Sequence, residues 1–256
     1  MQNLKADLYE MESKEPEKVE IKLFYECLCP GCRVFDTTSL KPTVEKLAPY
    51  LNLRLYPYGN AETIEIRNGV YQFKCQHGPK ECYGNKLHAC VIDYMSNNTE
   101  AVFFNSCLMD SARKNNGSDD EAADECGRIL GIYPGQIKYC AKHDRGMLLL
   151  KHYGDESKKA GFKYVPYILI NGVENNGSKF MKDVCAAFKN PPAATPCVIS
   201  SSQKTDMKQR LRLPEAQLPP FPITDSPTTL KSLTPKRPAT HSGVLGVHGR
   251  RPLHTI

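Results

Sequence analysis

The chain has 256 residues, of which 40% are hydrophobic, so it can bury a real core and is interpreted as a globular protein with something appended. Its net charge of +6 is carried by the C-terminal tail, where nine Lys and Arg stand against three Asp and Glu from Val198 onward. Residues 1–197 are balanced in charge. A folded nucleic-acid-binding domain concentrates basic residues on its own surface, so we expect no nucleic acid as a partner.

The cysteine content points to an oxidising compartment. All eleven cysteines lie between Cys27 and Cys197, a density typical of secreted proteins. Three sequons agree with a secreted glycoprotein. Their acceptors are Asn97, Asn116 and Asn176. Residues 1–18 are polar and predict a disordered leader, without the apolar run of a signal peptide or membrane anchor. We therefore expect the true N-terminus, with its targeting segment, to be missing from this sequence.

The first predicted elements form a β-α-β unit. Alternating apolar residues from Val19 to Tyr25 predict a strand, and a helical pattern of apolar residues follows from Val34 to Leu40. Lys41-Pro42 interrupts this pattern, so the crossover is either kinked or made of two short helices. Alternation from Leu51 to Leu55 predicts the second strand.

Two thiols stand where the first strand gives way to the helix, in Cys29-Pro30-Gly31-Cys32. A thiolate at a helix N-terminus is stabilised by unpaired backbone N–H groups and by the helix dipole, which makes Cys29 the more acidic and reactive thiol. Arg33 could add to that stabilisation. Cys32 is then placed to attack a mixed disulfide and release the product. The pair is a candidate catalytic dithiol.

The same spacing also occurs in half of a zinc site. The second half would be another CxxC or a pair of histidines at ligand spacing. The next cysteines, Cys75, Cys82 and Cys90, are seven and eight residues apart, and the seven histidines form no such pair. The sequence therefore favours redox chemistry over zinc, and we expect neither a metal nor a cofactor.

The remaining elements alternate between short strands and helices. Pro57–Asn60 ends the second strand, and alternation over Val70–Cys75 predicts another short strand or ribbon. Residues 76–160 have helical composition, in segments separated by turn residues, and predict several short helices without a long one. Tyr164–Ile170 predicts a strand that contains a proline, and Asn171-Gly172 predicts a tight hairpin turn.

The end of the chain completes the predicted fold. A helix with Phe180, Val184 and Phe188 on one face would pack against the sheet. Residues 198–256 form a basic tail rich in Pro and Ser that predicts disorder. The resulting layout is α/β: a thioredoxin-like domain over residues 19–197 with a helical, disulfide-rich insertion at about 76–160. In such a fold Pro166 is either cis and facing the dithiol or a trans edge-strand proline.

The most specific motif is the segment Cys75–Cys90, which fits CQHGxxECxxNxxxxC. Its specified positions are Cys75, Gln76, His77, Gly78, Glu81, Cys82, Asn85 and Cys90. This segment resembles the signature of the gamma-interferon-inducible lysosomal thiol reductase family. Tyr56–Ala61 and Tyr164-Val165-Pro166 also resemble family segments, and the similarity covers about Val19 to Cys197.

The resemblance implies a disulfide reductase of lysosomes or the extracellular space that acts on protein disulfides at acidic pH. Cys29 and Cys32 would be its dithiol, and Val165 and Pro166 would contact the substrate. A small thiol would supply electrons, and no stable membrane insertion is implied. The alternative from the residues alone is a disulfide-rich secreted binding module with a non-catalytic CxxC.

Two features of this motif region stay open in the sequence. Eight cysteines outside the CxxC are expected to form structural disulfides, but they allow 105 connectivities. Cys27 is left over, and it could intercept the active thiol, link two chains or remain inert, which we expect. His77 could shuttle protons for the dithiol, although a structural hydrogen bond is the simpler expectation.

Overall fold

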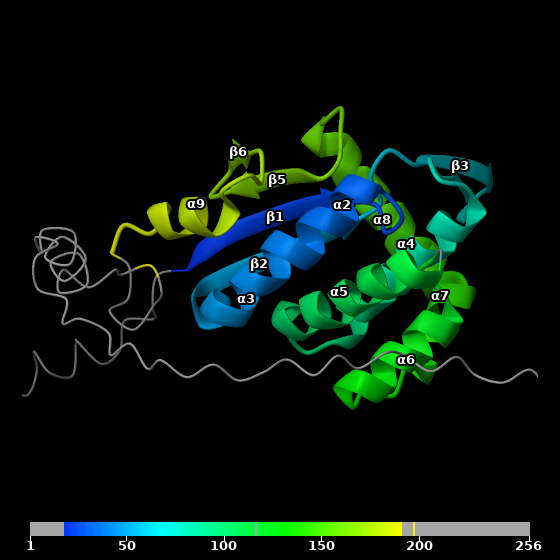
Figure 1. Ribbon diagram of the computed structural model, residues 1–256. Helices are drawn as coiled ribbons and strands as arrows, with labels where there is room; N and C mark the ends of the chain where they lie inside the picture. Colours follow the sequence, from blue (N-terminus) through cyan, green and yellow to red (C-terminus); the bar gives the residue numbers. More distant parts are fainter. Residues whose placement is uncertain (1–17, 116, 191–196, 198–256) are drawn as a thin grey trace, which may run out of the picture. The chain divides into compact units, whose positions relative to one another are not determined.

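A mixed four-stranded sheet organises the protein (Figure 1). The computed structural model describes residues 18–115, 117–190 and 197, so the expectations for the leader and for the tail from residue 198 lie outside the described residues. The strands are ordered β2-β1-β5-β6. Their bounds are β1 Val19–Tyr25, β2 Leu51–Pro57, β5 Tyr167–Ile170 and β6 Val173–Asn175. β1 pairs in parallel with β2 and antiparallel with β5, which confirms the predicted β-α-β unit and thioredoxin-like layout.

The crossover from β1 to β2 is helical throughout. Its segments are α2 (Pro30–Phe35), the π-helical turn η1 (Asp36–Leu40), α3 (Lys41–Leu47) and the 3₁₀ turn η2 (Ala48–Tyr50). The crossover therefore contains two short α-helices, which was one of the two alternatives predicted from the sequence. Pro42 lacks an N–H, so an α-helical bond to the residue four before it cannot form, and the wider π turn precedes it. The hydroxyls of Thr37 and Thr38 donate to the carbonyl oxygens of Arg33 and Val34 in α2.

The two faces of β1 are packed differently. On one face, the alternating side chains from Val19 to Tyr25 are at most 1% exposed and belong to the main hydrophobic core. That core also contains buried side chains of α9 (Phe180–Ala186), including Phe180 and Val184, as the sequence predicted. On the other face, Phe24 stacks on Tyr56 with 4.3 Å between ring centroids. The period-two pattern thus separates the main hydrophobic core on one face from the Phe24–Tyr56 stack on the other.

Five helices follow the second strand region and lie mostly to the right of the sheet in Figure 1. They are α4 (Pro79–Tyr94), α5 (Asn98–Asn115), α6 (Asp120–Leu130), α7 (Gly135–Lys142) and α8 (Asp144–Ala160). The expectation that none is long was wrong, because α4, α5 and α8 have 16, 18 and 17 residues. Glycines inside them mark close contacts rather than helix ends; a Cβ on Gly154 would lie 2.6 Å from the Tyr58 ring.

A two-stranded ribbon precedes these helices. β4 (Val70–Lys74) was predicted, whereas its antiparallel partner β3 (Glu62–Arg67) was not. The missed strand carries Ile64 and Ile66 at 42% and 54% exposure, so it lacks the buried alternation on which strand prediction depends.

The β5–β6 hairpin confirms the predicted turn. Asn171 and Gly172 have φ values of 48° and 81°, the left-handed conformations that a tight hairpin turn of this type needs. β5 begins at Tyr167 rather than at Tyr164. Pro166 has no N–H to donate, and its peptide bond to Val165 is cis, so the ladder starts only after it.

Four disulfides use the eight cysteines outside the CxxC, as expected, and fix a connectivity that the sequence left open. The pairs are Cys75–Cys82, Cys90–Cys140, Cys107–Cys126 and Cys185–Cys197. The second joins α4 to α7, and the third joins α5 to α6.

The outer strand of the sheet has a side-chain partner. β2 is the terminal strand in the sheet order of the described residues, and the Asn98 amide at the start of α5 donates to the Leu53 carbonyl. Within the described part of the chain, every helix is too short or too polar to cross a membrane.

Candidate active site

The two thiols of the CxxC stand at the first turn of α2, directly after the carboxyl end of β1. Cys29 is the N-cap residue, Pro30 occupies the first helical position, and the Cys29 carbonyl accepts a hydrogen bond from the Arg33 N–H at 3.0 Å. Cys29 is partly exposed, whereas Cys32 is 1% exposed, and neither forms a disulfide. The strand-to-helix placement that the sequence predicted is therefore present.

The two thiols have opposite tendencies to ionise. A hydrogen bond from Cys32 is the largest cause that lowers the pKa of Cys29 to about 6, with help from the N–H groups of Cys32 and Gly31 and from the charge of His77. Burial acts against these effects. Burial and the neighbouring Cys29 raise the pKa of Cys32 far above the usual range. The geometry favours a thiolate at Cys29 and a retained proton at Cys32, and His77 is a charged group that helps to lower the Cys29 pKa.

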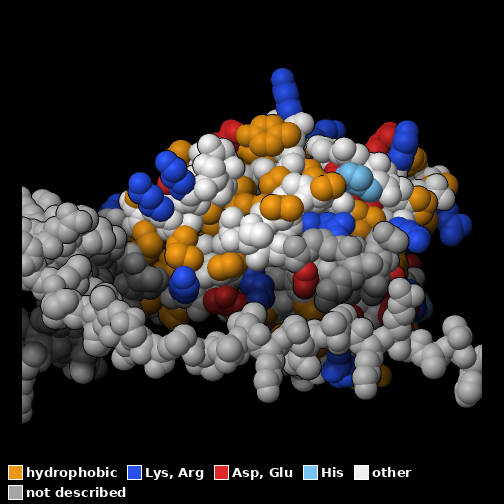
Figure 2. All heavy atoms as spheres, in the orientation of Figure 1, with side chains coloured by type: hydrophobic (Ala, Val, Ile, Leu, Met, Phe, Trp, Pro, Cys, Tyr) orange, Lys and Arg blue, Asp and Glu red, His pale blue; other side chains and the backbone are white. Residues whose placement is uncertain are grey.

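The loop before β5 lies against the dithiol. The Val165–Pro166 bond is cis, and a Cβ on Gly31 would lie 3.5 Å from Cδ of Pro166, so the proline does face the CxxC. Sγ of Cys29 is 4.0 Å from the Val165 carbonyl oxygen. Figure 2 shows hydrophobic side chains at the surface over this part of the molecule, and Val34 and Tyr164 are 55% and 52% exposed. The exposed side chains of Val34 and Tyr164 thus form an apolar rim beside the dithiol.

The signature segment folds into a loop and the first turns of α4. The Cys75–Cys82 disulfide closes the loop, and Gly78 adopts a φ of 86° as the residue that begins the helix. Gln76 accepts a hydrogen bond from the Asn60 side chain at 3.0 Å. Each of these contacts holds the loop beside the carboxyl end of β1.

Two further signature residues bind the segment that joins β1 to the dithiol. Oδ1 of Asn85 accepts the Cys27 N–H at 2.9 Å, and the carbonyl of Glu81 accepts from the Cys27 thiol at 3.6 Å. Cys27 is fully buried, and burial raises its pKa. β1 ends at Tyr25, so the alternation of the strand does not extend to Cys27 and Cys29. A buried thiol cannot link two chains, which supports the inert interpretation.

A buried carboxylate that the sequence did not single out lies beside these residues. Glu26 follows β1, is 0% exposed, and accepts the Asn60 N–H at 2.7 Å. Its Oε2 lies 3.5 Å from Nδ1 of His77, which is itself 2.6 Å from Oε2 of Glu81. His77 therefore does make the expected structural hydrogen bond, to Glu81. The only sequence signal for Glu26 was a charge directly after an apolar strand and before three cysteines.

The same three side chains are also candidate ligands for a metal ion. Among the described residues, Glu26, His77 and Glu81 offer ligand atoms within 4.8 Å of one another. Nδ1 of His77 is engaged at 2.6 Å by Glu81, which is the geometry of a shared proton. His77 and Glu81 are thus paired with each other, and Oε2 of Glu26 lies beside them without a hydrogen bond to either.

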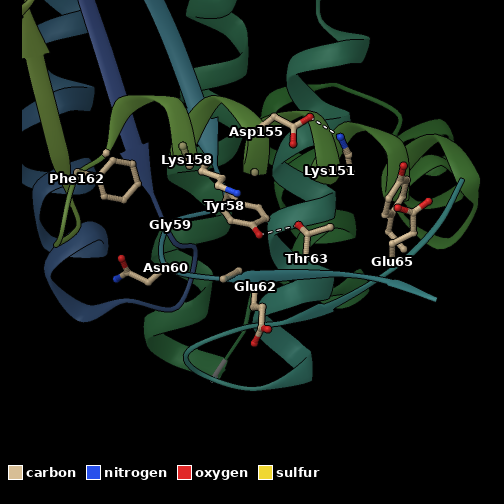
Figure 3. Close-up of a pocket in the computed structure, with 15 residues that line it drawn as sticks. Tyr58, Gly59, Asn60, Glu62, Thr63, Glu65, Lys151, Asp155, Lys158 and Phe162 are labelled. Atoms are coloured by element: carbon tan, nitrogen blue, oxygen red, sulfur yellow. Dashed lines mark hydrogen bonds and ion pairs between the residues drawn. The ribbon is translucent and has the colours of Figure 1, made fainter. Parts of the chain in front are cut away.

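A groove of about 680 Å³ opens on the other side of Glu26 (Figure 3). Gly59 and Asn60 form its edge, and a Cβ on Gly59 would overlap the Glu26 side chain. Inside it, Tyr58 is hydrogen-bonded to Thr63, and Lys151 pairs with Asp155 on α8. The groove is polar and of mixed charge, unlike the apolar rim of the dithiol.

The predicted glycosylation sites are only partly described. Asn97 and Asn176 are exposed, and both side chains accept hydrogen bonds from backbone N–H groups, of Glu100 and Ser178. Asn116 lies outside the described residues. Exposure is compatible with glycan attachment at the first two positions.

Comparison with known proteins identifies the family. Residues 20–129 match the model described as gamma interferon inducible lysosomal thiol reductase. The protein of that name from Carassius auratus is 34% identical over 191 residues, covering 69% of this chain and 71% of that protein. GILT-like protein 2 from Drosophila melanogaster is 32% identical over 167 residues, covering 64% of this chain and 75% of that protein.

Solved structures agree on the fold. DsbA from Mycobacterium tuberculosis, in its reduced form, superposes with a TM-score of 0.50 at 17% identity, covering 72% of this chain and 92% of that one. At this identity the likeness speaks for the thioredoxin-like fold alone. The sequence relatives carry the functional assignment: the chain is a disulfide reductase that belongs to the gamma-interferon-inducible lysosomal thiol reductase family.

Proposed function

We propose that this oxidoreductase reduces protein disulfides through Cys29 as nucleophile and Cys32 as resolving thiol, and that it does so at acidic pH. The observation that carries the proposal is the pKa of Cys29, lowered to about 6 at the start of α2. At pH 5 such a thiol is a thiolate in about one molecule in ten, whereas an unperturbed thiol near 8.5 is one in only about one in several thousand. Acid chemistry therefore becomes feasible.

The reaction follows from the asymmetry of the two thiols. The Cys29 thiolate attacks one sulfur of the substrate disulfide, forms a mixed disulfide, and expels the other sulfur as a thiolate that takes a proton. Cys32 then gives up its proton and attacks Sγ of Cys29. This step forms the Cys29–Cys32 disulfide and releases the second substrate thiol. Two electrons pass to the substrate, and two molecules of a small thiol restore the dithiol while becoming a disulfide.

The loop at Val165 and Pro166 is the proposed substrate contact. The Val165 carbonyl lies 4.0 Å from Sγ of Cys29, close enough for an extended substrate backbone to pair beside the reacting sulfur. The exposed Val34 and Tyr164 supply an apolar surface of the kind that unfolded chains bind. Substrates would be partly unfolded proteins with accessible disulfides.

The compartment and modifications follow from the relatives and the surface. Two relatives are named as lysosomal thiol reductases, which supports a lysosomal or extracellular location. The exposed Asn97 and Asn176 support N-glycosylation in the secretory pathway, with Asn116 as a third acceptor.

The decisive experiment compares Cys29→Ser with Cys27→Ser. Each variant is assayed for reduction of a denatured disulfide-bonded protein at pH 5, and each is alkylated under native conditions and mapped by mass spectrometry. We expect Cys29→Ser to abolish reduction and Cys27→Ser to retain it, with Cys29 as the selectively labelled thiol. Full activity in Cys29→Ser, or a Cys29 that resists mild alkylation, would contradict the proposal and favour a binding module.

A further inference from the structure

Three titratable side chains from separate segments converge beside the dithiol. Glu26 comes from the end of β1, His77 from the disulfide-closed loop, and Glu81 from the first turn of α4. Both carboxylates are 0% exposed, and the His77 side chain is 31% exposed. The imidazole therefore connects two buried acids to solvent.

The two carboxylates of this group, Glu26 and Glu81, differ in how many of their oxygens accept hydrogen bonds. Glu81 uses both oxygens on His77: Oε1 accepts the backbone N–H at 2.9 Å, and Oε2 engages Nδ1 at 2.6 Å. Glu26 uses only Oε1, which accepts the Asn60 N–H at 2.7 Å. Its Oε2 is buried and has no hydrogen-bond partner among the described residues; the nearest charged atom is Nδ1 of His77 at 3.5 Å. Glu26 is thus the acid with an oxygen open to a proton.

The charges that face Glu26 come from every segment packed on it. They are Glu81 and His77 from the signature segment, and Cys27, Cys29 and Cys32 from its own side. Burial is the largest of the causes that raise the pKa of Glu26 to about 7; the charges of Glu81 and Cys29 also raise it, while the Asn60 N–H and His77 lower it. Because electrostatic coupling is reciprocal, an ionised Glu26 disfavours the Cys29 thiolate.

We propose that Glu26, His77 and Glu81 form a proton-binding group that keeps Cys29 ionised as the surroundings become acidic. In acid, Glu26 holds a proton on Oε2 and loses its charge, while His77 stays paired with Glu81. As the pH falls and the protonated thiol becomes favoured, the net charge facing Cys29 becomes less negative. At neutral pH the ionised Glu26 repels the thiolate. The inference rests on the proposed function and assigns His77 and Glu81 of the signature a positioning role toward the reacting sulfur.

The test measures the ionisation of Cys29 directly, without a substrate. The full reduced chain is titrated from pH 3 to 9 by the ultraviolet absorbance of its thiolate and by the rate of iodoacetamide alkylation mapped to Cys29. Glu26→Gln keeps the shape and the acceptor for Asn60 but removes the charge. We expect it to lower the Cys29 midpoint by at most about half a pH unit, because Glu26 already holds its proton over most of the range below pH 7, and to sharpen the titration towards a single proton.

His77→Gln removes the cation and is expected to shift the midpoint the other way. The fraction of Cys29 thiolate at pH 5 should fall about threefold to tenfold, which corresponds to about half to one pH unit. Glu45→Gln and His152→Ala, on exposed helix faces, serve as matched controls and should leave the midpoint in place.

The outcomes separate the two proposals. Identical Cys29 midpoints in wild type, Glu26→Gln and His77→Gln would overturn the proton-binding role while leaving the dithiol chemistry intact. A wild-type Cys29 that is not alkylated at any pH would instead overturn the proposed function. Circular dichroism of each variant at pH 5 and pH 7 confirms that only folded protein is compared.

Discussion

The dithiol corner and the helical insert use cysteine in opposite ways. The dithiol corner comprises the end of β1, the first turn of α2 and the loop at Pro166; the helical insert comprises α4 to α8. In the insert, Cys90, Cys140, Cys107 and Cys126 are consumed in disulfides that join helix to helix. In the corner, Cys27, Cys29 and Cys32 remain thiols. Position relative to a helix N-terminus and to charge separates reactive sulfur from structural sulfur.

The corner and the insert also differ in how they hold charge. Ion pairs of the insert, such as Lys138 with Asp124, lie near the surface, where solvent screens them. The corner buries Glu26 completely, and Asp36 is 2% exposed in the π turn behind it. The insert also buries two titratable side chains, Glu81 and His88 of α4, which face the end of β1, and burial lowers the pKa of His88 to about 3. Sensitivity to pH should therefore concentrate where α4 and the dithiol meet the end of β1. The predictions below test this division.

The largest effect is expected from Cys32→Ser. The variant should still attack a substrate disulfide through Cys29, but it should stop at the mixed disulfide, because no second thiol resolves it. Turnover should fall by two orders of magnitude or more, equivalent to about 3 kcal/mol in activation free energy. Non-reducing mass spectrometry would detect the trapped adduct. Undiminished turnover without an adduct would show that a thiol other than Cys32 resolves the mixed disulfide.

Removal of a disulfide from the insert should change stability and leave the chemistry alone. Cys90→Ala/Cys140→Ala opens a loop with a separation of 50 residues and should lower the free energy of unfolding by about 2–5 kcal/mol. Cys107→Ala/Cys126→Ala, with a separation of 19, should lose about 1 kcal/mol less. Urea unfolding measures both. A drop in reductase activity per folded molecule would break the division between corner and insert.

Gly84 tests the contact between the two regions. A Cβ there would lie 2.5 Å from Sγ of Cys27 and 3.0 Å from the Ser118 carbonyl, so Gly84→Ala should destabilise the fold by about 1–3 kcal/mol. Adding Cys27→Ala should recover part of that loss by removing the sulfur. Gly117→Ala, which meets nothing closer than 3.9 Å, is the control and should stay near wild type in urea unfolding. If Gly84→Ala lowered the free energy of unfolding equally with and without Cys27→Ala, α4 would not pack against this thiol.

The last prediction concerns how the stability depends on pH through Asp36. Burial raises its pKa from 3.8 to about 7, so the folded protein holds this proton more tightly than the unfolded chain does. The resulting stability is fully present below about pH 4 and is lost as the pH rises towards 7, by at most about 1.4 kcal/mol per pH unit. Asp36→Asn should flatten this slope between pH 5 and 6.5 in urea unfolding. Asp124→Asn, in the insert, should not; a flattened slope there would contradict the localisation of pH sensitivity.

The sequence predicted the elements whose residues are neighbours in the chain. Strand β1, the dithiol at the helix start and the Asn171-Gly172 turn each follow from local pattern and backbone preference. The lengths of α4 and α8 were underestimated, and the glycines within these helices are sites where another segment approaches closely. Local pattern does not report what packs against a glycine.

The candidate site was predictable only in part, for a similar reason. Cys29 and Cys32 are marked by their spacing, whereas Glu26 is a single charge with no periodic signal. Its partners His77 and Glu81 belong to a segment that only the folded chain brings to the end of β1. The disulfide pairing is likewise a property of the three-dimensional arrangement, since spacing alone permits every connectivity.

The hydrogen bond from the Asn98 side-chain amide to the Leu53 carbonyl also affects how the edge of the sheet meets other protein chains. An outer strand with free backbone groups is a template on which a neighbouring chain can build. By occupying one acceptor of β2, Asn98 makes this margin of the sheet a poorer place for strand addition. One side-chain amide thus protects a sheet edge that the backbone alone would leave open to aggregation.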